Sequence, residues 1–347
     1  MKKILPFDAN PPIISYQYHA FGLGILFQHE NFIDYFIGDY NNIKYNMDDP
    51  LHSLDFCINF PWIYWFNYEL FTINFLQYSD KSFISKYSVE DFISTVIYMI
   101  NLDFYIYSGA NEYYLPNRRA YNKNYGRKDC IIYGYDTDSG MLNSIGYDAN
   151  GIYKEFQISY EDYFNSILSY KEENWYNTIC FLKVNPNYNF CLNLSNFKRQ
   201  ISDYLHSTNT NRDIGLGESI AFGIKVYDII IDNILREPKN IHIGYMRILM
   251  EHKNCMYLRI EYLLKKGYLK NYSLLSEYES IVNDFKTIFN LSIKNNVKYS
   301  EATPNRIVAH IKIAIDKEKV ILSEVLDSLM TVPRSDVKEI WDTIKNT

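Results

Sequence analysis

Hydrophobic and polar residues follow two different periods along the chain, and the change of period divides it into two parts. Before about residue 193, short runs of β-forming residues alternate with turns, and they predict strands over 104–107, 129–135, 141–145, 152–158 and 176–184. Beyond that point the hydrophobic residues recur at helical spacing, and they predict helices over 194–206, 218–235, 243–266, 273–294 and 303–330. Strands followed by helices predict an α+β domain over 1–190 and an all-α domain over 191–347.

Two helices inside the first part have clear start signals. Ser88 followed by Asp91, and Ser159 followed by Asp162, each place a capping hydroxyl before an acidic residue that favours the positive end of a helix. A longer helix is predicted over 17–38, where two early glycines weaken the first turns. Residues 40–87 are aromatic and irregular, and we expect loops there. The first part therefore combines helices with an antiparallel meander.

Composition and charge remove several classes of protein. The 347 residues are 47% hydrophobic, which is enough for two domains with separate cores. The net charge is −6 and no long basic run occurs, so a nucleic-acid partner is not expected. The most apolar stretch, Phe56 to Leu76, is interrupted by Asn59, Pro61 and Glu69, and a membrane span is therefore not expected. MKKILPFDANPP at the start has no apolar run of signal length.

The cysteines point to a reducing compartment. There are five, they are widely spaced, and none forms a CxxC pair. An odd and scattered set disfavours a disulfide framework and a zinc site, so we expect no metal, no cofactor and a cytoplasmic location.

Several motifs carry a resemblance to a known fold. The segment DCIIYGYDTDSGMLNSIGYDANGIYKEFQISYEDY has the strand–turn–strand–turn–strand–capped-helix order of proteins related to butirosin biosynthesis protein H. The overall order resembles the papain-like fold, especially its bacterial C39-type branch. A narrower bacterial group, often encoded near nonribosomal peptide synthetase or other natural-product genes, is similar in YHAFGLGIL (18–26), PWIYWF (61–66), EYYLPNRRAY (112–121), IIYGYD (131–136) and MEHKNCMYLRIEYL (250–263). The resemblance implies a papain-like N-terminal domain.

The positions that this resemblance makes catalytic are occupied by other residues. In the C39-type branch a cysteine begins the first long helix, a histidine opens a later strand, and an acid on the next strand orients the histidine. This chain has Ala20-Phe21-Gly22 and Lys128-Asp129-Cys130 at the first two positions, and Asp148 is the candidate acid. The resemblance therefore implies a catalytically degenerate domain, in which His19–Gly22 faces Lys128 and Cys130 across a groove.

Each member of this relict cleft (His19, Phe21, Lys128, Cys130 and Asp148) also has a structural interpretation. His19 is either a polar group of the cleft or an exposed or capping residue. Cys130 is either a displaced nucleophile or a buried strand thiol, and burial is favoured because free cysteine is usually buried. Cys57 with His52 is a further candidate pair of nucleophile and base, on sequence proximity alone.

Four other residues are candidates for binding. Arg118 and Arg119 follow Pro116 in a loop, where they bind an anionic group, such as a phosphopantetheine carrier or a carboxylate, or are simply solvated. His252 and Arg259 share a stripe of the predicted helix 243–266. They either face a ligand or the other domain in a polar network, or form a structural interdomain ion pair.

Two hypotheses of function remain. The first is a non-catalytic accessory or binding protein of peptide natural-product biosynthesis, which binds a carrier protein, a peptide synthetase or a peptide-like small molecule. The second is an acyltransferase or amide-forming enzyme that moves an acyl group from a carrier-protein thioester to an amine. The first predicts no covalent thiol catalysis and burial of all five cysteines.

Overall fold

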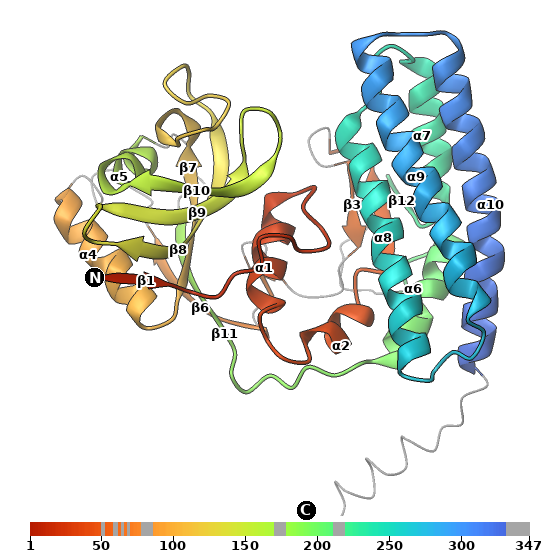
Figure 1. Cartoon of the computed structure of the whole chain (residues 1–347), viewed down its shortest axis with the longest axis horizontal. Helices are drawn as coiled ribbons and strands as arrows, with labels where there is room; N and C mark the ends of the chain where they lie inside the picture. Colours follow the sequence, from red (N-terminus) through yellow and green to blue (C-terminus); the bar gives the residue numbers. More distant parts are fainter. Residues whose placement is uncertain are drawn as a thin grey trace, which may run out of the picture. The chain divides into compact units, whose positions relative to one another are not determined.

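A computed structural model of the chain (Figure 1) describes residues 1–49, 53–57, 62–63, 66–67, 70–77, 86–169, 178–210 and 219–330. The chain divides into two compact units. The first comprises Met1–Phe32 and Phe60–Phe190, and the second comprises Ile33–Asn59 and Cys191–Thr347. Residues 33–59 therefore belong with the C-terminal helices, whereas the sequence pattern assigned them to the first domain.

The first unit is built on a seven-stranded antiparallel sheet. Its strand order is β10-β9-β8-β7-β11-β6, and β1 pairs with β8. The strands are β1 (Lys2–Ile4), β6 (Phe71–Gln77), β7 (Tyr105–Asn111), β8 (Arg127–Asp136), β9 (Met141–Tyr147), β10 (Tyr153–Ser159) and β11 (Thr178–Val184). A separate ribbon pairs β4 (Trp62–Ile63) with β5 (Phe66–Asn67). The predicted strands are confirmed, whereas β6 lies in the region where loops were expected.

Helices cover both faces of this sheet. They are α1 (Gln17–Leu26), α4 (Val89–Asn101) and α5 (Tyr160–Leu168), with a 3-10 turn η1 at Glu112–Tyr114. The predicted caps are confirmed, since the Asp91 amide donates to the Ser88 hydroxyl at 3.1 Å and the Asp162 amide donates to Ser159 at 3.0 Å. Both α4 and α5 contact β7, while α1 lies against β8 (Figure 1).

The helix predicted over 17–38 is two helices. After α1 ends at Leu26, the chain turns, and α2 covers Phe32–Ile37. Asn31 in the turn has φ 65, a left-handed conformation that asparagine tolerates better than most residues. Gly24 does not break α1 but lets it approach the N-terminal segment, because a Cβ there would lie 2.4 Å from the Phe7 ring.

The second unit combines helices with a small antiparallel sheet of order β12-β2-β3. Its strands are β2 (Asn42–Asn46), β3 (Leu54–Cys57) and β12 (Ile220–Phe222). Residues beyond 193 are thus not wholly helical, and the helix predicted over 218–235 begins only at Lys225. Gly223 ends β12 with φ +56, and a Cβ on it would lie 2.1 Å from the Tyr204 carbonyl oxygen. This close turn separates strand from helix.

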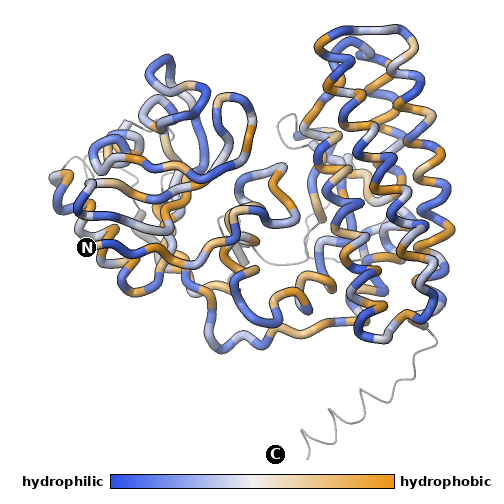
Figure 2. The backbone as a smooth tube through the Cα atoms, viewed as in Figure 1, coloured by the Kyte–Doolittle hydropathy of each residue, from blue (hydrophilic) through white to orange (hydrophobic). Residues whose placement is uncertain are grey.

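The helices of the second unit are α2, α6 (Leu194–His206), α7 (Lys225–Arg236), α8 (Ile243–Lys265), α9 (Ser273–Val297) and α10 (Ala302–Met330). Helix α9 packs extensively against both α8 and α10, and α6 and α7 also pack on α10. Hydrophobic and hydrophilic residues alternate along these helices, as expected where one side is buried (Figure 2). Among the described residues, no helix has the length and apolarity that a membrane crossing requires.

A charged pair is buried inside this helical unit. The Lys253 ammonium lies 2.6 Å from a Glu318 carboxylate oxygen, and neither side chain is exposed (0% each). The Tyr204 hydroxyl donates to the same carboxylate at 2.6 Å, and the Tyr278 hydroxyl donates to its other oxygen. Burial lowers the pKa of Lys253 to about 8 and Glu318 opposes the shift, so the ammonium is mostly charged at neutral pH.

Candidate functional site

The start of α1 meets the start of β8 through a set of interlocked polar side chains. Gln17, the first residue of α1, donates from Nε2 to the Asp129 carbonyl oxygen at 2.8 Å. The Tyr107 hydroxyl donates to the Asp129 carboxylate at 2.9 Å. Arg118 donates from Nη1 to the Gln17 side-chain oxygen at 3.1 Å. We call these four residues, Gln17, Tyr107, Arg118 and Asp129, the α1–β8 junction.

Arg118 is the most constrained member of the junction. Its side chain is buried and donates to the Tyr147 carbonyl at 2.6 Å as well as to Gln17. The guanidinium lies 4.7 Å from the centre of the Phe156 ring. It also occupies the space that a Cβ on Gly146 would need, since such an atom would lie 2.1 Å from Nη2. Burial lowers its pKa, but an arginine stays charged at neutral pH.

The two faces of the sheet place Cys130 away from α1. Tyr107 of β7 points toward α1, because its ring lies 6.3 Å from the Phe21 ring. The next residue, Ser108, points toward α5, because its hydroxyl lies 3.1 Å from the Tyr163 hydroxyl. Cys130 is the cross-strand partner of Ser108. Because neighbouring side chains point to opposite faces, Cys130 shares the α5 side. The prediction that Cys130 faces the start of α1 is therefore wrong, and Asp129 holds that place.

The remaining cleft candidates are separated by the fold. His19 is buried within α1, with its ring 4.4 Å from that of Tyr18, so it is neither exposed nor a cap. Lys128 is exposed and pairs across the strands with Ala110. Phe21 is fully buried in the core. These three do not form a polar cleft together.

Asp148 stabilises a turn. One carboxylate oxygen accepts the backbone N–H groups of Asn150 (2.8 Å) and Ile152 (2.9 Å), and the other lies 2.8 Å from the Lys154 ammonium. The hydrogen bond from Lys154 and those from the backbone lower its pKa. Its bonds are accounted for by the turn between β9 and β10, and none of them orients a base.

The two binding arginines have opposite environments. Arg118 is committed to Gln17 and to backbone carbonyls, so its guanidinium is not open to a carrier phosphate. Arg119, the next residue, is exposed, and it remains compatible with either a solvated or an anion-binding role.

His252 and Arg259 hold the 33–59 segment against α8 within the second unit. His252 lies 3.0 Å from the Asn41 carbonyl, and burial lowers its pKa well below the ordinary value. Arg259 donates to the Phe36 carbonyl at 3.3 Å and to that of Asp39, at the end of α2. A helix end carries partial negative charge, which a buried guanidinium neutralises. Within the described part of the chain, both residues therefore bond to backbone carbonyls of their own unit, which is a structural role.

Four cysteines are buried and one is exposed. Burial raises the pKa of Cys130 to about 11 and that of Cys180 to about 12. The pKa values of Cys57 and Cys255 are also raised to about 12. Cys191 is exposed, which corrects the prediction that all five are buried. His52, the proposed partner of Cys57, lies outside the described residues.

A groove of about 610 Å³ lies in the first unit, beyond the C-terminal end of α1. Its apolar wall is formed by Leu5, Pro6, Tyr105, Tyr188 and Phe190. The Tyr188 and Phe190 rings lie 5.1 Å apart. This volume is within the range of roughly 300–1,000 Å³ that is usual for small-molecule sites.

Glu30, Asp103 and Lys183 line the rest of this groove, and Lys3 reaches Asp103 from outside the lining. Lys3 and Lys183 lie 2.7 Å and 3.7 Å from the Asp103 carboxylate, and the hydrogen bond from Lys3 lowers the pKa of Asp103. Burial lowers the pKa of His29, which favours the neutral form of this imidazole. The groove therefore combines an aromatic wall with an edge on which Asp103 is paired and Glu30 is a second carboxylate.

Sequence reasoning singled out Arg118, as a binding residue, but missed the other three residues of the junction. Gln17 precedes the YHAFGLGIL motif by one position, and Asp129 lies between the two strand residues that were selected. Strand alternation alone allows either Asp129 or its neighbours to face α1. Ile131 and Tyr133 lie on the same strand face as Asp129, at two-residue spacing. Since residues on both faces of this strand are hydrophobic, the pattern does not show which face α1 covers.

The junction holds amide, carboxylate, phenol and guanidinium groups, which bind and orient one another. None of the four is a thiol or an imidazole of the kind that the papain-like resemblance requires at this place. Among the described residues, no cluster of His, Cys, Asp and Glu could hold a metal ion. The chain matches no family model and no curated protein in sequence.

Proposed function

We propose that this chain is a non-catalytic binding protein of peptide natural-product biosynthesis, built on a degenerate papain-like scaffold. The observation that carries the proposal is the α1–β8 junction, because Arg118, Gln17 and Asp129 bond to one another where the resemblance expects a nucleophile and a base. A substrate carbonyl would have to compete with these bonds for the same polar groups. The acyltransferase alternative needs that place to be open.

The groove of the first unit supplies a binding surface instead. Its aromatic and proline wall suits an apolar side chain of a peptide-like molecule, because such rings contribute large contact areas with few rotatable bonds. Because Asp103 is already paired with Lys3 and Lys183, it needs no cation on the ligand, and the other carboxylate of the lining, Glu30, is exposed. We propose an uncharged, peptide-like ligand with aromatic or aliphatic side chains.

The test uses N-acetyl-leucyl-tyrosinamide as the probe and the full chain as the receptor. We expect saturable binding by titration calorimetry, weakened at least about fivefold by Tyr188→Ala because the aromatic wall is lost. Tyr272→Ala is the matched control, since Tyr272 is 69% exposed and lies in the helical unit. Equal binding by both variants would show that the ligand binds elsewhere, and it would overturn the proposal that the groove is the binding site.

Catalysis is tested separately, on the full chain and on its Cys191→Ser variant. The protein is incubated with an acyl N-acetylcysteamine thioester and an amine acceptor, and intact mass and product are followed. The proposal expects no amide product above the uncatalysed rate and no acyl adduct on Cys191→Ser protein. Turnover would favour the acyltransferase.

A further inference from the structure

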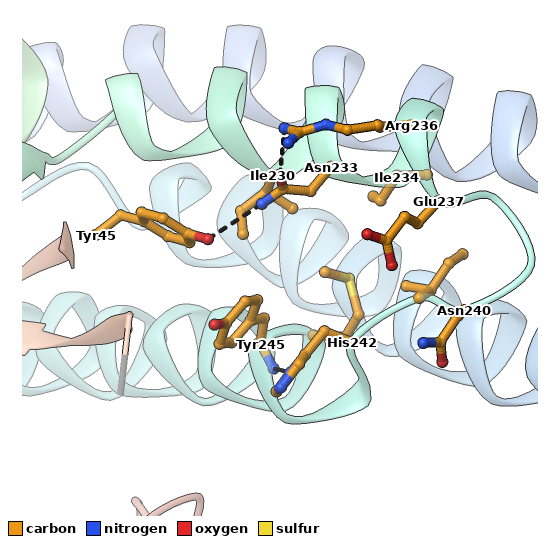
Figure 3. A pocket seen from close by; sticks show the side chains of 11 residues that line it. Tyr45, Ile230, Asn233, Ile234, Arg236, Glu237, Asn240, His242 and Tyr245 are labelled. Atoms are coloured by element: carbon orange, nitrogen blue, oxygen red, sulfur yellow. Dashed lines mark hydrogen bonds between the residues drawn. The ribbon is translucent and has the colours of Figure 1, made fainter. Parts of the chain in front are cut away.

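The second unit contains a separate pocket of about 260 Å³ (Figure 3). It lies between the last turn of α7 and the first turn of α8, with Tyr45 of β2 at one end. The chain between the two helices, 237–242, closes it. The volume is slightly below the usual range for drug-sized ligands, so only a small molecule fits.

Two stacked rings form one wall of this pocket. The His242 ring lies 3.7 Å from the Tyr245 ring at an interplanar angle of 21°, and the Tyr45 ring meets Tyr245 edge-on at 5.8 Å. Gly244 leaves space for this stack, because a Cβ there would approach His242 Cε1 to 3.0 Å. The wall is therefore fixed by packing before any ligand binds.

The imidazole of this wall is neutral at pH 7. His242 is the N-cap of α8, and its Nδ1 accepts the Tyr245 backbone N–H at 3.2 Å. Accepting that bond requires Nδ1 without a proton, so the ring proton is on Nε2. Burial also lowers the pKa of His242. The stacked pair thus presents π faces and no positive charge.

The two charged residues at the pocket point in different directions. Arg236 donates from its guanidinium to the Asn233 side chain at 2.8 Å, and Asn233 in turn donates to the Tyr45 hydroxyl at 3.2 Å. The Glu237 carboxylate points into the pocket (Figure 3). Within the described part of the chain, no cation pairs with Glu237. Arg236 is held by a neutral side chain and keeps its charge, whereas the Glu237 carboxylate faces the cavity.

The end of α7 adds to the negative character. Glu237 is the C-cap of α7, and the last carbonyls of a helix carry partial negative charge. The opposing start of α8 is partly neutralised, since the Tyr245 amide already donates to His242. Carboxylate, helix C-terminus and aromatic faces together favour a positively charged group.

We propose that this pocket binds a small organic cation, a primary amine or a guanidine attached to a flat or apolar group. The charged end pairs with Glu237, the stacked rings of His242 and Tyr245 contact it or its flat part, and Ile230 and Met246 cover the apolar part. The site is independent of the peptide groove and of the activity proposed above.

The test compares benzylamine with benzyl alcohol and benzoate, which share its size but differ in charge. For the full chain we expect benzylamine to bind at least about tenfold more tightly than the other two. Glu237→Gln should abolish this preference while leaving the circular dichroism spectrum and thermal unfolding unchanged, because the side chain is exposed. Glu279→Gln, an exposed substitution on α9 outside the pocket, should keep the preference.

Four results would overturn the proposal. Equal binding of amine and alcohol would remove the role of charge. Tighter binding of benzoate would identify Arg236 as the determinant. Retention of the preference in Glu237→Gln, or absence of binding by all three probes, would show that the pocket is not a cation site.

Discussion

Replacing Glu318 by glutamine is expected to destabilise the helical unit by about 3–5 kcal/mol. Glutamine has the same shape, but it leaves the Lys253 ammonium buried without a counter-charge. The Tyr204 and Tyr278 hydroxyls, which donate to the carboxylate, also lose their anionic acceptor. The change is measured as a shift in the urea midpoint of the helical unit, followed by far-ultraviolet circular dichroism.

Glu324→Gln is the matched control on the same helix. Glu324 is exposed and accepts one hydrogen bond from Asn271 at 2.7 Å, so we expect a change within about 0.5 kcal/mol. If Glu318→Gln behaved like Glu324→Gln, the Lys253–Glu318 pair would not be a buried ion pair in solution.

Replacing Arg118 by leucine is expected to destabilise the first unit by about 3–5 kcal/mol, the sum of several buried acceptors left without a donor. The Tyr147 carbonyl and the Gln17 side chain each lose a charged donor, and Gln17 in turn holds Asp129. The loss is measured by urea unfolding, with proteolysis of the first unit as the signal that reports its unfolding. Arg118→Lys should recover only part of it, because an ammonium cannot match the planar fork of guanidinium donors.

Arg119→Leu is the control for this prediction. The two arginines are adjacent, but only Arg118 is buried, so the Arg119 variant should change the free energy of unfolding by no more than about 0.5 kcal/mol. Similar effects of both substitutions would show that Arg118 is not committed to the α1–β8 junction. A small effect of Arg118→Leu alone would leave this arginine available for a ligand.

Local signals in the sequence were sufficient for much of the fold. The capping hydroxyls of Ser88 and Ser159 start helices where predicted, and the turn at Asp148 joins the predicted strands. Each of these depends on residues within a few positions of one another. The succession of antiparallel strands and C-terminal helices followed from the same local patterns.

Long-range pairing explains what the sequence did not reveal. β12 exists because Ala221 pairs with Tyr45, which is distant in the chain, and this contact also draws the 33–59 segment into the second unit. The orientation of Cys130 depended on which face of the sheet α1 covers. Burial of Arg118 depended on the missing side chain at Gly146. None of these partners is adjacent in sequence to the residue it determines.

Thiol reactivity of the folded protein measures whether any buried cysteine of this scaffold acts as a nucleophile. Cys191→Ser protein, which retains only the four buried cysteines, is treated with iodoacetamide at neutral pH and mapped by mass spectrometry. We predict negligible labelling of Cys57, Cys130, Cys180 and Cys255 until the protein is unfolded, because burial raises their pKa values and blocks access. Rapid stoichiometric labelling of one of them in the folded protein, lost on replacing His19, would contradict the account and identify a rearranged cysteine enzyme.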